Sequence, residues 1–273
     1  MNDLPEVGPG EVAIWWLGQA SFVLGFAGAT VLVDPFLSAH PERLVPPPFA
    51  PEEATGIDVV AVTHDHLDHL DEESLPVIAA ASPGARFVAP LPVVERLGVP
   101  LERVSGLRPA ETAELGALRV HAVRALHGDL PADAYSFDGA AGDGAYRFLG
   151  YVFEAGGVCV YHAGDTLLFD GLAEDVRALA PDVALLPING RDAEREALGL
   201  VGNLDEREAV ELAAAAGVDL LVPMHWDMFA DNPGSPDKAV ELAGGHPGLS
   251  VLIASREQPF VYRGRRPGPN TVW

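Results

Sequence analysis

The chain of 273 residues carries 17 lysines and arginines against 40 aspartates and glutamates, a formal net charge of −23 at pH 7. Its hydrophobic fraction of 48% and charged fraction of 21% are typical of a globular protein and argue against disorder. A single cysteine, Cys159, excludes a disulfide scaffold within the chain. The acidic balance disfavours general nucleic-acid binding, because like charge repels the phosphate backbone.

Residues 12–33 form an uncharged stretch that is long enough for a transmembrane helix. Glycines and polar residues interrupt this stretch, and the residues before it lack the positive charge typical of a signal peptide. Its short runs of β-branched and aromatic residues instead predict three buried strands, at 11–17, 20–26 and 29–33. We therefore expect a cytoplasmic location and no membrane association, in keeping with one unpaired cysteine.

Short apolar runs and turn residues predict the elements that follow. A proline-rich loop over 35–56 is too long for a simple connector, so we expect it to cover a site. Glycine positions and hydrophobic periods then predict strands at 57–63 and 86–90 and helices after residue 71 and at 91–98. Two further strands are predicted within 112–126. A long loop at 128–145 and a hairpin of 146–155 with 158–163 are expected to follow.

The C-terminal third alternates between helical and strand patterns. Helices are predicted at 171–180, 205–217 and 235–244, the second with a capping box of Asp205 and Glu208 and the third with Ser235 as N-cap. Strands are predicted at 182–187, 219–223, 249–253 and 259–262. This order predicts an α/β protein of one domain, residues 1–273, whose helices cover sheets from outside.

The sequence His64-Asp65-His66-Leu67-Asp68-His69 follows directly after a predicted strand. His64 and His66 are two residues apart, so in extended chain they point to the same side and can bind one metal ion. Asp68 and His69 follow where the chain turns, and can face a second ion. Imidazole and carboxylate are standard ligands of zinc, manganese and iron.

The string THDHLDH resembles the H-x-H-x-D-H signature of the metallo-β-lactamase fold hydrolases, and further matches follow in chain order. The resemblance implies a four-layer αβ/βα sandwich with a dinuclear site at one sheet edge. It implies that one metal is held by His64, His66 and His127, that a second is held by Asp68, His69 and His225, and that Asp165 bridges them. Asp68 and Asp165 are then the catalytic carboxylates, and Asp34 orients a histidine from behind. From strand parity alone, His121 remains a rival to His127, which is preferred because it lies beyond the strand end beside a glycine.

The strings WLGQASFVL, YHAGDT and PMHWDMF are similar to the branch that contains L-ascorbate-6-phosphate lactonase. This similarity implies two divalent ions, zinc or manganese with iron as the alternative, and a metal-bound hydroxide that opens a lactone or a related ester. The small-molecule substrate would be sugar-derived or phosphorylated. The competing hypothesis is a phosphodiesterase similar to N-acylphosphatidylethanolamine phospholipase D, acting on a nucleotide or a phospholipid headgroup. A non-catalytic metal-binding domain is disfavoured by the complete ligand set.

Four further residues are candidates for substrate binding. Arg191 follows a predicted strand end, where its guanidinium could bind a substrate anion or pair with Asp192 or Glu194. Asn189, Trp226 and Gln19 are expected to border the same pocket. His162 is interpreted as a residue that supports a ligand from behind or packs in the core, and Cys159 as a buried apolar residue. Surface positions are expected for His40, His246, Arg263, Arg265 and Arg266.

Overall fold

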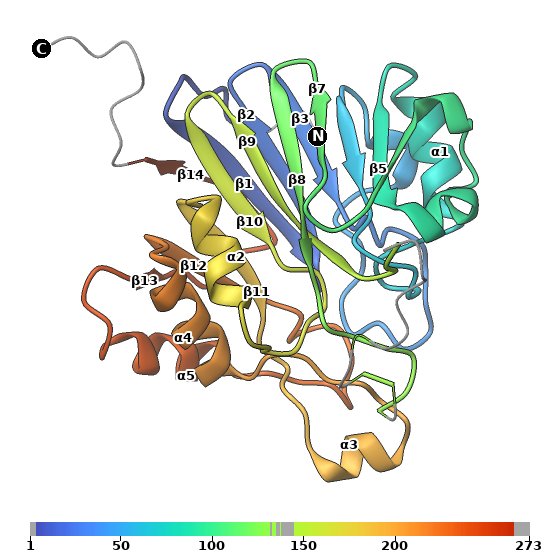
Figure 1. The fold of residues 1–273 in the computed structure, drawn as a ribbon. Coiled ribbons are helices and arrows are strands. Elements are labelled where there is room, and N and C mark those ends of the chain that lie inside the picture. Colours follow the sequence, from blue (N-terminus) through green and yellow to red (C-terminus); the bar gives the residue numbers. More distant parts are fainter. Residues whose placement is uncertain (1–3, 132, 135–136, 138–144, 265–273) are drawn as a thin grey trace, which may run out of the picture.

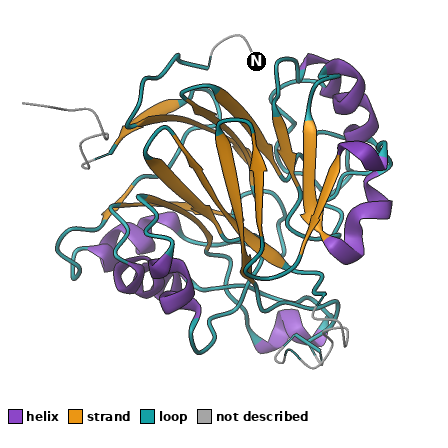
Figure 2. Ribbon diagram, turned by 45° about the horizontal axis from the view of Figure 1, so that its top comes forward, coloured by secondary structure: helices purple, strands orange, loops and turns teal. Residues whose placement is uncertain are grey.

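The computed structural model describes residues 4–131, 133–134, 137 and 145–264. Two β-sheets lie face to face in the middle of the molecule, and helices cover the outer face of each (Figures 1 and 2). Among the described residues, each sheet has seven strands. The expected αβ/βα sandwich of the metallo-β-lactamase fold is confirmed.

The first sheet contains the strands predicted within the uncharged N-terminal stretch. The four strands on one side of the sheet, formed by residues 260–263, 11–18, 21–26 and 29–33, pair antiparallel, whereas the pairs on the other side are parallel. Its order is β14 (Phe260–Arg263), β1 (Glu11–Gly18), β2 (Ser21–Phe26), β3 (Ala29–Val33), β4 (Val59–Ala61), β5 (Arg86–Pro90) and β6 (Val104–Leu107).

The second sheet is built from the C-terminal part of the chain together with the two hairpin regions. Strands β7 to β10 pair antiparallel, and β10 to β13 pair parallel. Its order is β13 (Ser250–Val251), β12 (Leu220–Met224), β11 (Val183–Pro187), β10 (Val158–His162), β9 (Leu149–Ala155), β8 (Leu118–Arg124) and β7 (Thr112–Leu115).

Three apolar clusters hold the four layers together. The largest lies between the sheets, with Phe22 and Leu24 from the first and Tyr151 and Phe153 from the second. On the outer side of the first sheet, α1 (Ser74–Ala81) buries Leu75 and Ile78. The outer side of the second sheet is covered by α2 (Leu172–Ala178), α4 (Glu206–Ala216) and α5 (Pro236–Ala243). Because both faces of each sheet are covered, central strands such as β2 and β11 are buried along their whole length.

Most predicted elements are present within a few residues of their expected bounds, but several differ. The strand expected at 57–63 ends at Ala61, because the backbone N–H of Thr63 donates to the Asp34 carboxylate (2.7 Å) instead of to a neighbouring strand. The helix expected at 91–98 is a 3₁₀ helix, η2 (Leu91–Leu97). The strand β6 and the short helix α3 (Ala193–Ala197) were not predicted.

The predicted N-caps of α4 and α5 lie at the expected residues, but only one of the two side chains makes a capping hydrogen bond. Asp205 and Glu208 form the expected capping box of α4, and Gly217 ends that helix in the left-handed conformation. Ser235 occupies the N-cap of α5, yet its side chain makes no capping hydrogen bond. The remaining 3₁₀ turns are η1 (Pro51–Glu53) and η3 (Leu101–Arg103).

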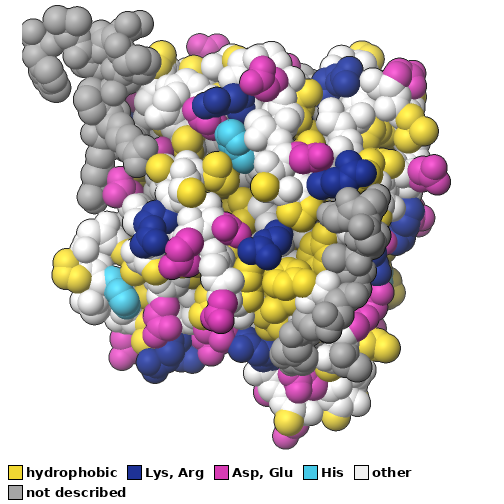
Figure 3. Space-filling view, viewed as in Figure 1, with side chains coloured by type: hydrophobic (Ala, Val, Ile, Leu, Met, Phe, Trp, Pro, Cys, Tyr) yellow, Lys and Arg dark blue, Asp and Glu magenta, His cyan; other side chains and the backbone are white. Residues whose placement is uncertain are grey.

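The surface mixes both signs of charge despite the large negative total. On the face shown in Figure 3, acidic and basic side chains are interspersed. Within the part of the chain that the structure describes, no helix combines the length and the apolar character needed to cross a membrane. The uncharged N-terminal stretch folds into the strands β1, β2 and β3.

Candidate metal centre

The chemistry-bearing residues all lie just beyond the C-terminal ends of strands. His64, His66, Asp68 and His69 follow β4, whereas His127, Asp165 and His225 follow β8, β10 and β12, respectively. These last three strands run in the same direction, since β8 and β10 both pair antiparallel with β9, and β10 to β12 are parallel. Their loops therefore meet at one edge of the second sheet, where open α/β folds bind ligands.

His64, His66 and His127 form a first cluster, in which one ligand atom of each lies within 4.8 Å of the others. Nε2 of His64 is buried and has no hydrogen-bond partner among the described residues. Burial lowers the pKa of His64 well below its ordinary value and lowers the pKa of His127 to about 3. Neutral imidazoles with an unpaired buried nitrogen are suited to bind a metal ion.

Asp68, His69 and His225 form a second cluster of the same size. Nε2 of His225 is 3.3 Å from Asp68 Oδ2. Burial opposes protonation of His225, but the Asp165 and Asp68 carboxylates outweigh burial and raise its pKa to about 9. For the same reasons the pKa of His69 lies well above its ordinary value. The buried carboxylates here require positive charge, which a divalent cation supplies as well as protons do.

Asp165 lies between the clusters. Its Oδ1 atom is 3.2 Å from Nε2 of both His69 and His225, and its Oδ2 atom is 3.6 Å from His127 Nε2. His64, His69 and Asp165 also form a potential ligand group. A carboxylate in this position can contact an ion in either cluster, and the donor set therefore fits the metals that the sequence implies.

Asp34 lies behind His69, as expected from the sequence. Its Oδ2 atom is 2.7 Å from Nδ1 of His69 and also accepts a hydrogen bond from the Thr63 hydroxyl (2.7 Å). The backbone φ angles of Asp34 (43°) and His225 (62°) lie in the left-handed region that few non-glycine residues adopt. Surrounding contacts maintain such backbone strain. Here the strained backbone directs the side chains of Asp34 and His225 towards the metal centre.

A polar network outside the predicted set supports His66. Asp129 Oδ1 is 3.2 Å from His66 Nε2. Arg147 donates to Asp129 Oδ2 from Nη1 (2.7 Å) and to Asp65 Oδ1 from Nη2 (2.6 Å). Sequence reasoning missed both Asp129 and Arg147. Only Asp129 carried a local signal, since it follows His127 by two residues.

The structure places Arg191, a predicted substrate-binding residue, in an ion pair with α4. Its guanidinium donates two hydrogen bonds of 2.7 Å to Glu208 on α4, and a third to the Asn203 carbonyl (3.1 Å). The ion pair that the structure gives to Arg191 is with Glu208 and not with a neighbour in the sequence. Asp192 instead caps α3 and pairs with Arg195. Arg191 therefore ties the loop after β11 to α4.

The other three predicted substrate contacts lie behind the pocket. Gln19 donates from Nε2 to Asp68 Oδ2 (2.7 Å) and so fixes a candidate ligand. Asn189 joins two loops through Asn203 and Asn232. Trp226 packs against Trp16 with ring centroids 5.3 Å apart. None of these three is among the residues that line the pocket in the described part of the chain.

His121, the rival candidate for the first cluster, is not part of the metal centre. His121 lies away from the centre, beside Thr112 (2.9 Å) and Glu154 (3.2 Å), so the structure brings His127 and not His121 to the cluster. His162 is fully buried, with Nε2 2.8 Å from the Ala20 carbonyl oxygen. Cys159 is partly exposed, contrary to expectation. Arg263 pairs with Glu11 at the surface, and Arg265 and Arg266 lie outside the described residues.

A pocket of about 340 Å³ opens above the two clusters. His66, Asp68, His127, Asp165 and His225 form its floor. His40 was expected to be an ordinary surface residue, but it lines this pocket beside Phe229 (ring centroids 6.1 Å apart). Its presence agrees with the expectation that loop 35–56 covers a site.

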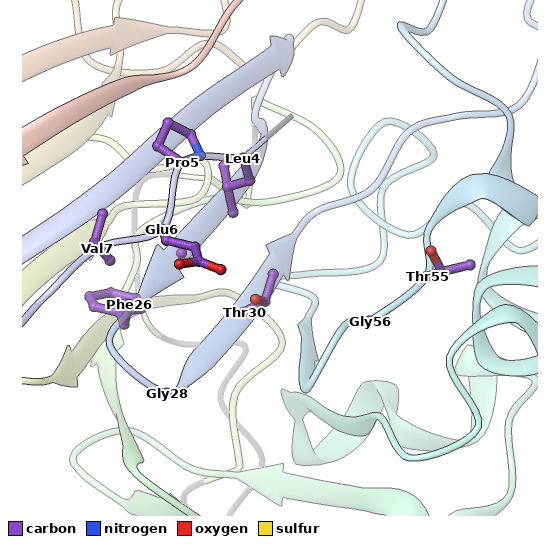
Figure 4. Close-up of a pocket in the computed structure, with 10 residues that line it drawn as sticks. Leu4, Pro5, Glu6, Val7, Phe26, Gly28, Thr30, Thr55 and Gly56 are labelled. Carbon is purple, nitrogen blue, oxygen red and sulfur yellow. The ribbon is translucent and has the colours of Figure 1, made fainter. Parts of the chain in front are cut away.

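A separate cavity of about 380 Å³ lies beside the turn between β2 and β3 (Figure 4). It is lined by the segment Leu4 to Val7 and by Phe26, Thr30 and Thr55, and Glu6 is its sole titratable lining residue among those described. The histidine-lined pocket is therefore the better candidate for an active site.

The chain matches the family model described as "Beta-lactamase superfamily domain" over residues 29–226. It is 31% identical to a UPF0173 metal-dependent hydrolase of Methanosarcina mazei, covering 85% of this chain and 91% of that one. Its identity to a relative from Methanoregula boonei is 34%, covering 87% and 92%, respectively. Among solved structures, Igni18, a metallo hydrolase from Ignicoccus hospitalis, superposes with a TM-score of 0.72 at 22% identity, over 93% of this chain and 100% of that one.

The family match spans most of the chain and includes each candidate ligand from His64 to His225. The two curated relatives are similar over nearly their whole length. The specific resemblance to lactonases has no such support. The chain belongs to the UPF0173 metal-dependent hydrolases of the metallo-β-lactamase superfamily.

Proposed function

We propose that this metal-dependent hydrolase opens a lactone or cleaves a related carboxylic ester of a small molecule, with two divalent ions at the centre. The observation that carries the proposal is the meeting of two ligand clusters and one intermediate carboxylate beneath a single pocket. Zinc and manganese both suit this mixture of imidazoles and carboxylates, and iron is the alternative.

His64, His66 and His127 would hold one ion, and Asp68, His69 and His225 the other, with Asp165 contacting both. Two bound divalent ions supply the chemistry of hydrolysis by lowering the pKa of a water molecule toward about 7 and by polarising the carbonyl oxygen. Asp68 is partly exposed to the pocket, so its carboxylate can orient the attacking water by a hydrogen bond. Gln19 keeps that carboxylate in place.

The proposal is tested by elemental analysis of the purified protein and by a substrate screen with each metal restored after chelation. Lactones, aryl esters and phosphodiesters form the arms of the screen. We expect up to two transition-metal ions per chain and metal-dependent hydrolysis of lactones or esters. Hydrolysis of phosphodiesters alone would support the competing phosphodiesterase hypothesis. Full activity in the metal-free protein would refute a metal-dependent mechanism.

A further inference from the structure

Several residues that line the pocket above the metal centre are apolar. Leu67, Leu200, Val201 and Phe229 line it, and the Leu67 side chain is 52% exposed. Phe229 is held in place by Phe36 and His40, with ring centroids 6.4 and 6.1 Å away. Exposed apolar side chains in a pocket favour a ligand that covers them, by about fourfold in affinity for each methylene buried.

The rim of the same pocket carries negative charge. Glu42, Asp129 and Asp231 are exposed lining residues from three different loops. Within the described ranges, Glu42 and Asp231 have no ion-pair partner, whereas Asp129 is bound by Arg147. A substrate with a remote carboxylate or phosphate would meet like charge here.

The guanidinium groups on the neighbouring loops each make hydrogen bonds within the fold, although Nη2 of Arg43 is buried without a hydrogen-bond partner among the described residues. Arg43 turns back onto the carbonyl oxygens of Phe36 (2.6 Å) and Val45 (3.0 Å). Arg147 is shared between Asp65 and Asp129. Similarly, Arg195 binds Asp192, the Asn189 carbonyl and Asn232 Oδ1, and Arg191 binds Glu208. Releasing any of them to bind a substrate anion would break ion pairs or hydrogen bonds that the fold already makes.

From these three features we infer that the substrate is an uncharged small ester or lactone with an apolar side group, and that phosphorylated and carboxylated substrates are disfavoured. The inference rests on the proposed hydrolase function. It reverses the expectation that Arg191 recognises an anion. The metal ions attract the reacting carbonyl, while the charge of the rim acts on the part of the substrate that projects away from them.

Two aryl esters of nearly equal size test the inference: 4-nitrophenyl butyrate, which is uncharged, and mono-4-nitrophenyl succinate, which is anionic. We expect kcat/KM to be at least tenfold higher for the butyrate at low ionic strength. The double variant E42Q/D231N should raise the ratio of kcat/KM for the succinate to kcat/KM for the butyrate at least threefold. In the unmodified protein, added salt should reduce the difference in kcat/KM between the butyrate and the succinate, because exposed charges are screened over about 10 Å at 0.1 M.

Binding can be measured independently of turnover, so that a failure of the proposed function can be distinguished from a failure of this inference. In the cobalt-substituted protein, visible spectra report the binding of butyrohydroxamate and of succinic monohydroxamate, which present the same chelating group with a methyl or a carboxylate end. We expect tighter binding of butyrohydroxamate, and Phe229→Ala should weaken it more than it weakens acetohydroxamate. Preference for the uncharged compound without ester hydrolysis would retain this inference and reject the esterase function. Equal or tighter binding of the carboxylated compound would overturn the inference.

Discussion

At the residue scale, Asp165 differs from the other candidate ligands because its two oxygens face different clusters. Oδ1 lies 3.2 Å from Nε2 of His225, and Oδ2 lies 3.6 Å from Nε2 of His127. The remaining candidates each belong mainly to one side. The consequences of substitution should therefore divide into two classes.

We expect Asp165→Asn to weaken binding of both metal ions together, because the amide removes the negative charge that both clusters share. His127→Ala should weaken mainly one ion, and His225→Ala mainly the other. Calorimetric titration with zinc or manganese, checked by elemental analysis, measures affinity and stoichiometry. His121→Ala is the matched control and should bind both ions normally. Normal binding in His127→Ala, with loss in His121→Ala, would contradict the ligand assignment.

At the element scale, the loops that follow β4 and β8 are joined by Arg147, which lies just before β9. This residue holds Asp65 in one loop and Asp129 in the other, and Asp129 contacts His66. His66 is 28% exposed, so packing alone restrains it less than the buried His64. The network therefore fixes the orientation of the most accessible imidazole in the first cluster.

Replacing Arg147 with methionine should lower metal affinity about 10- to 100-fold, the usual effect of losing a group that orients a ligand. The readout is the dissociation constant of the first cluster's ion, together with the melting temperature of the metal-free protein. Arg119→Met is the control, because Arg119 pairs with Glu154 at the surface away from the centre. An unchanged metal affinity in Arg147→Met would show that packing suffices to place His66.

Arg191 provides the second test at this scale, since it joins the loop after β11 to the first turn of α4. Burial would raise the pKa of Glu208, but hydrogen bonds from Arg191 and the Asp205 backbone outweigh it and hold the pKa below its ordinary value. We expect Arg191→Ala to destabilise the fold by about 1–2 kcal/mol at pH 7, since the pair is bidentate and half-buried. Hydrolysis of uncharged esters should be unchanged.

The pH dependence of this effect has a defined sign. A carboxylate whose pKa is lowered by folding contributes stability above its unfolded pKa of about 4.3, and that contribution is lost as pH falls through the lower folded value. The difference in unfolding free energy between the unmodified protein and Arg191→Ala should therefore shrink below pH 4. Denaturant titrations at pH 7, 5 and 3.5 measure it, with Arg177→Ala as an exposed control. A difference that grows toward acid pH would contradict the ion-pair account.

At the scale of the whole molecule, the metal centre joins the two halves of the chain. The first sheet provides the loop with His64 to His69, and the second provides His127, Asp165 and His225. Metal ions bound here would link loops from both sheets. Without them, the buried carboxylates depend on protonated His69 and His225 for charge balance.

Chelation should therefore lower the melting temperature by about 5–10 °C for each ion removed, when free metal was present at about 100 times its dissociation constant. This value follows from the roughly 2.7 kcal/mol that such binding adds to stability. Calorimetry of the metal-free and reloaded protein measures the shift, and Asp165→Asn should reduce it. A melting temperature indifferent to chelation, in protein shown to lose its metal, would mean that the ions do not stabilise the fold.

Local patterns in the sequence by themselves determined the order of strands and helices, and the family resemblance implied the four-layer sandwich and the candidate ligands. Short apolar runs ending in His64 or Asp34 are local patterns, and strand pairing brings such ends to one edge. The capping box at Asp205 is equally local, and it occurs as predicted. Features that depend on periodicity or on neighbours within a few residues are mostly retained on folding, although Ser235 at the N-cap of α5 makes no capping hydrogen bond.

Only the tertiary structure decided which distant side chains meet. Strand parity left His121 as a rival to the preferred His127, and the structure places only His127 among the candidate ligands, because β8 ends at Arg124 and His127 lies in the loop that follows. Arg191 lies beside two acidic residues in sequence, yet it binds Glu208, seventeen residues away, because α4 packs against its loop. Likewise, Phe229 and Glu42 become pocket residues through the paths of their loops. Such contacts depend on where loops lead in space, and the period of a sequence does not encode that direction.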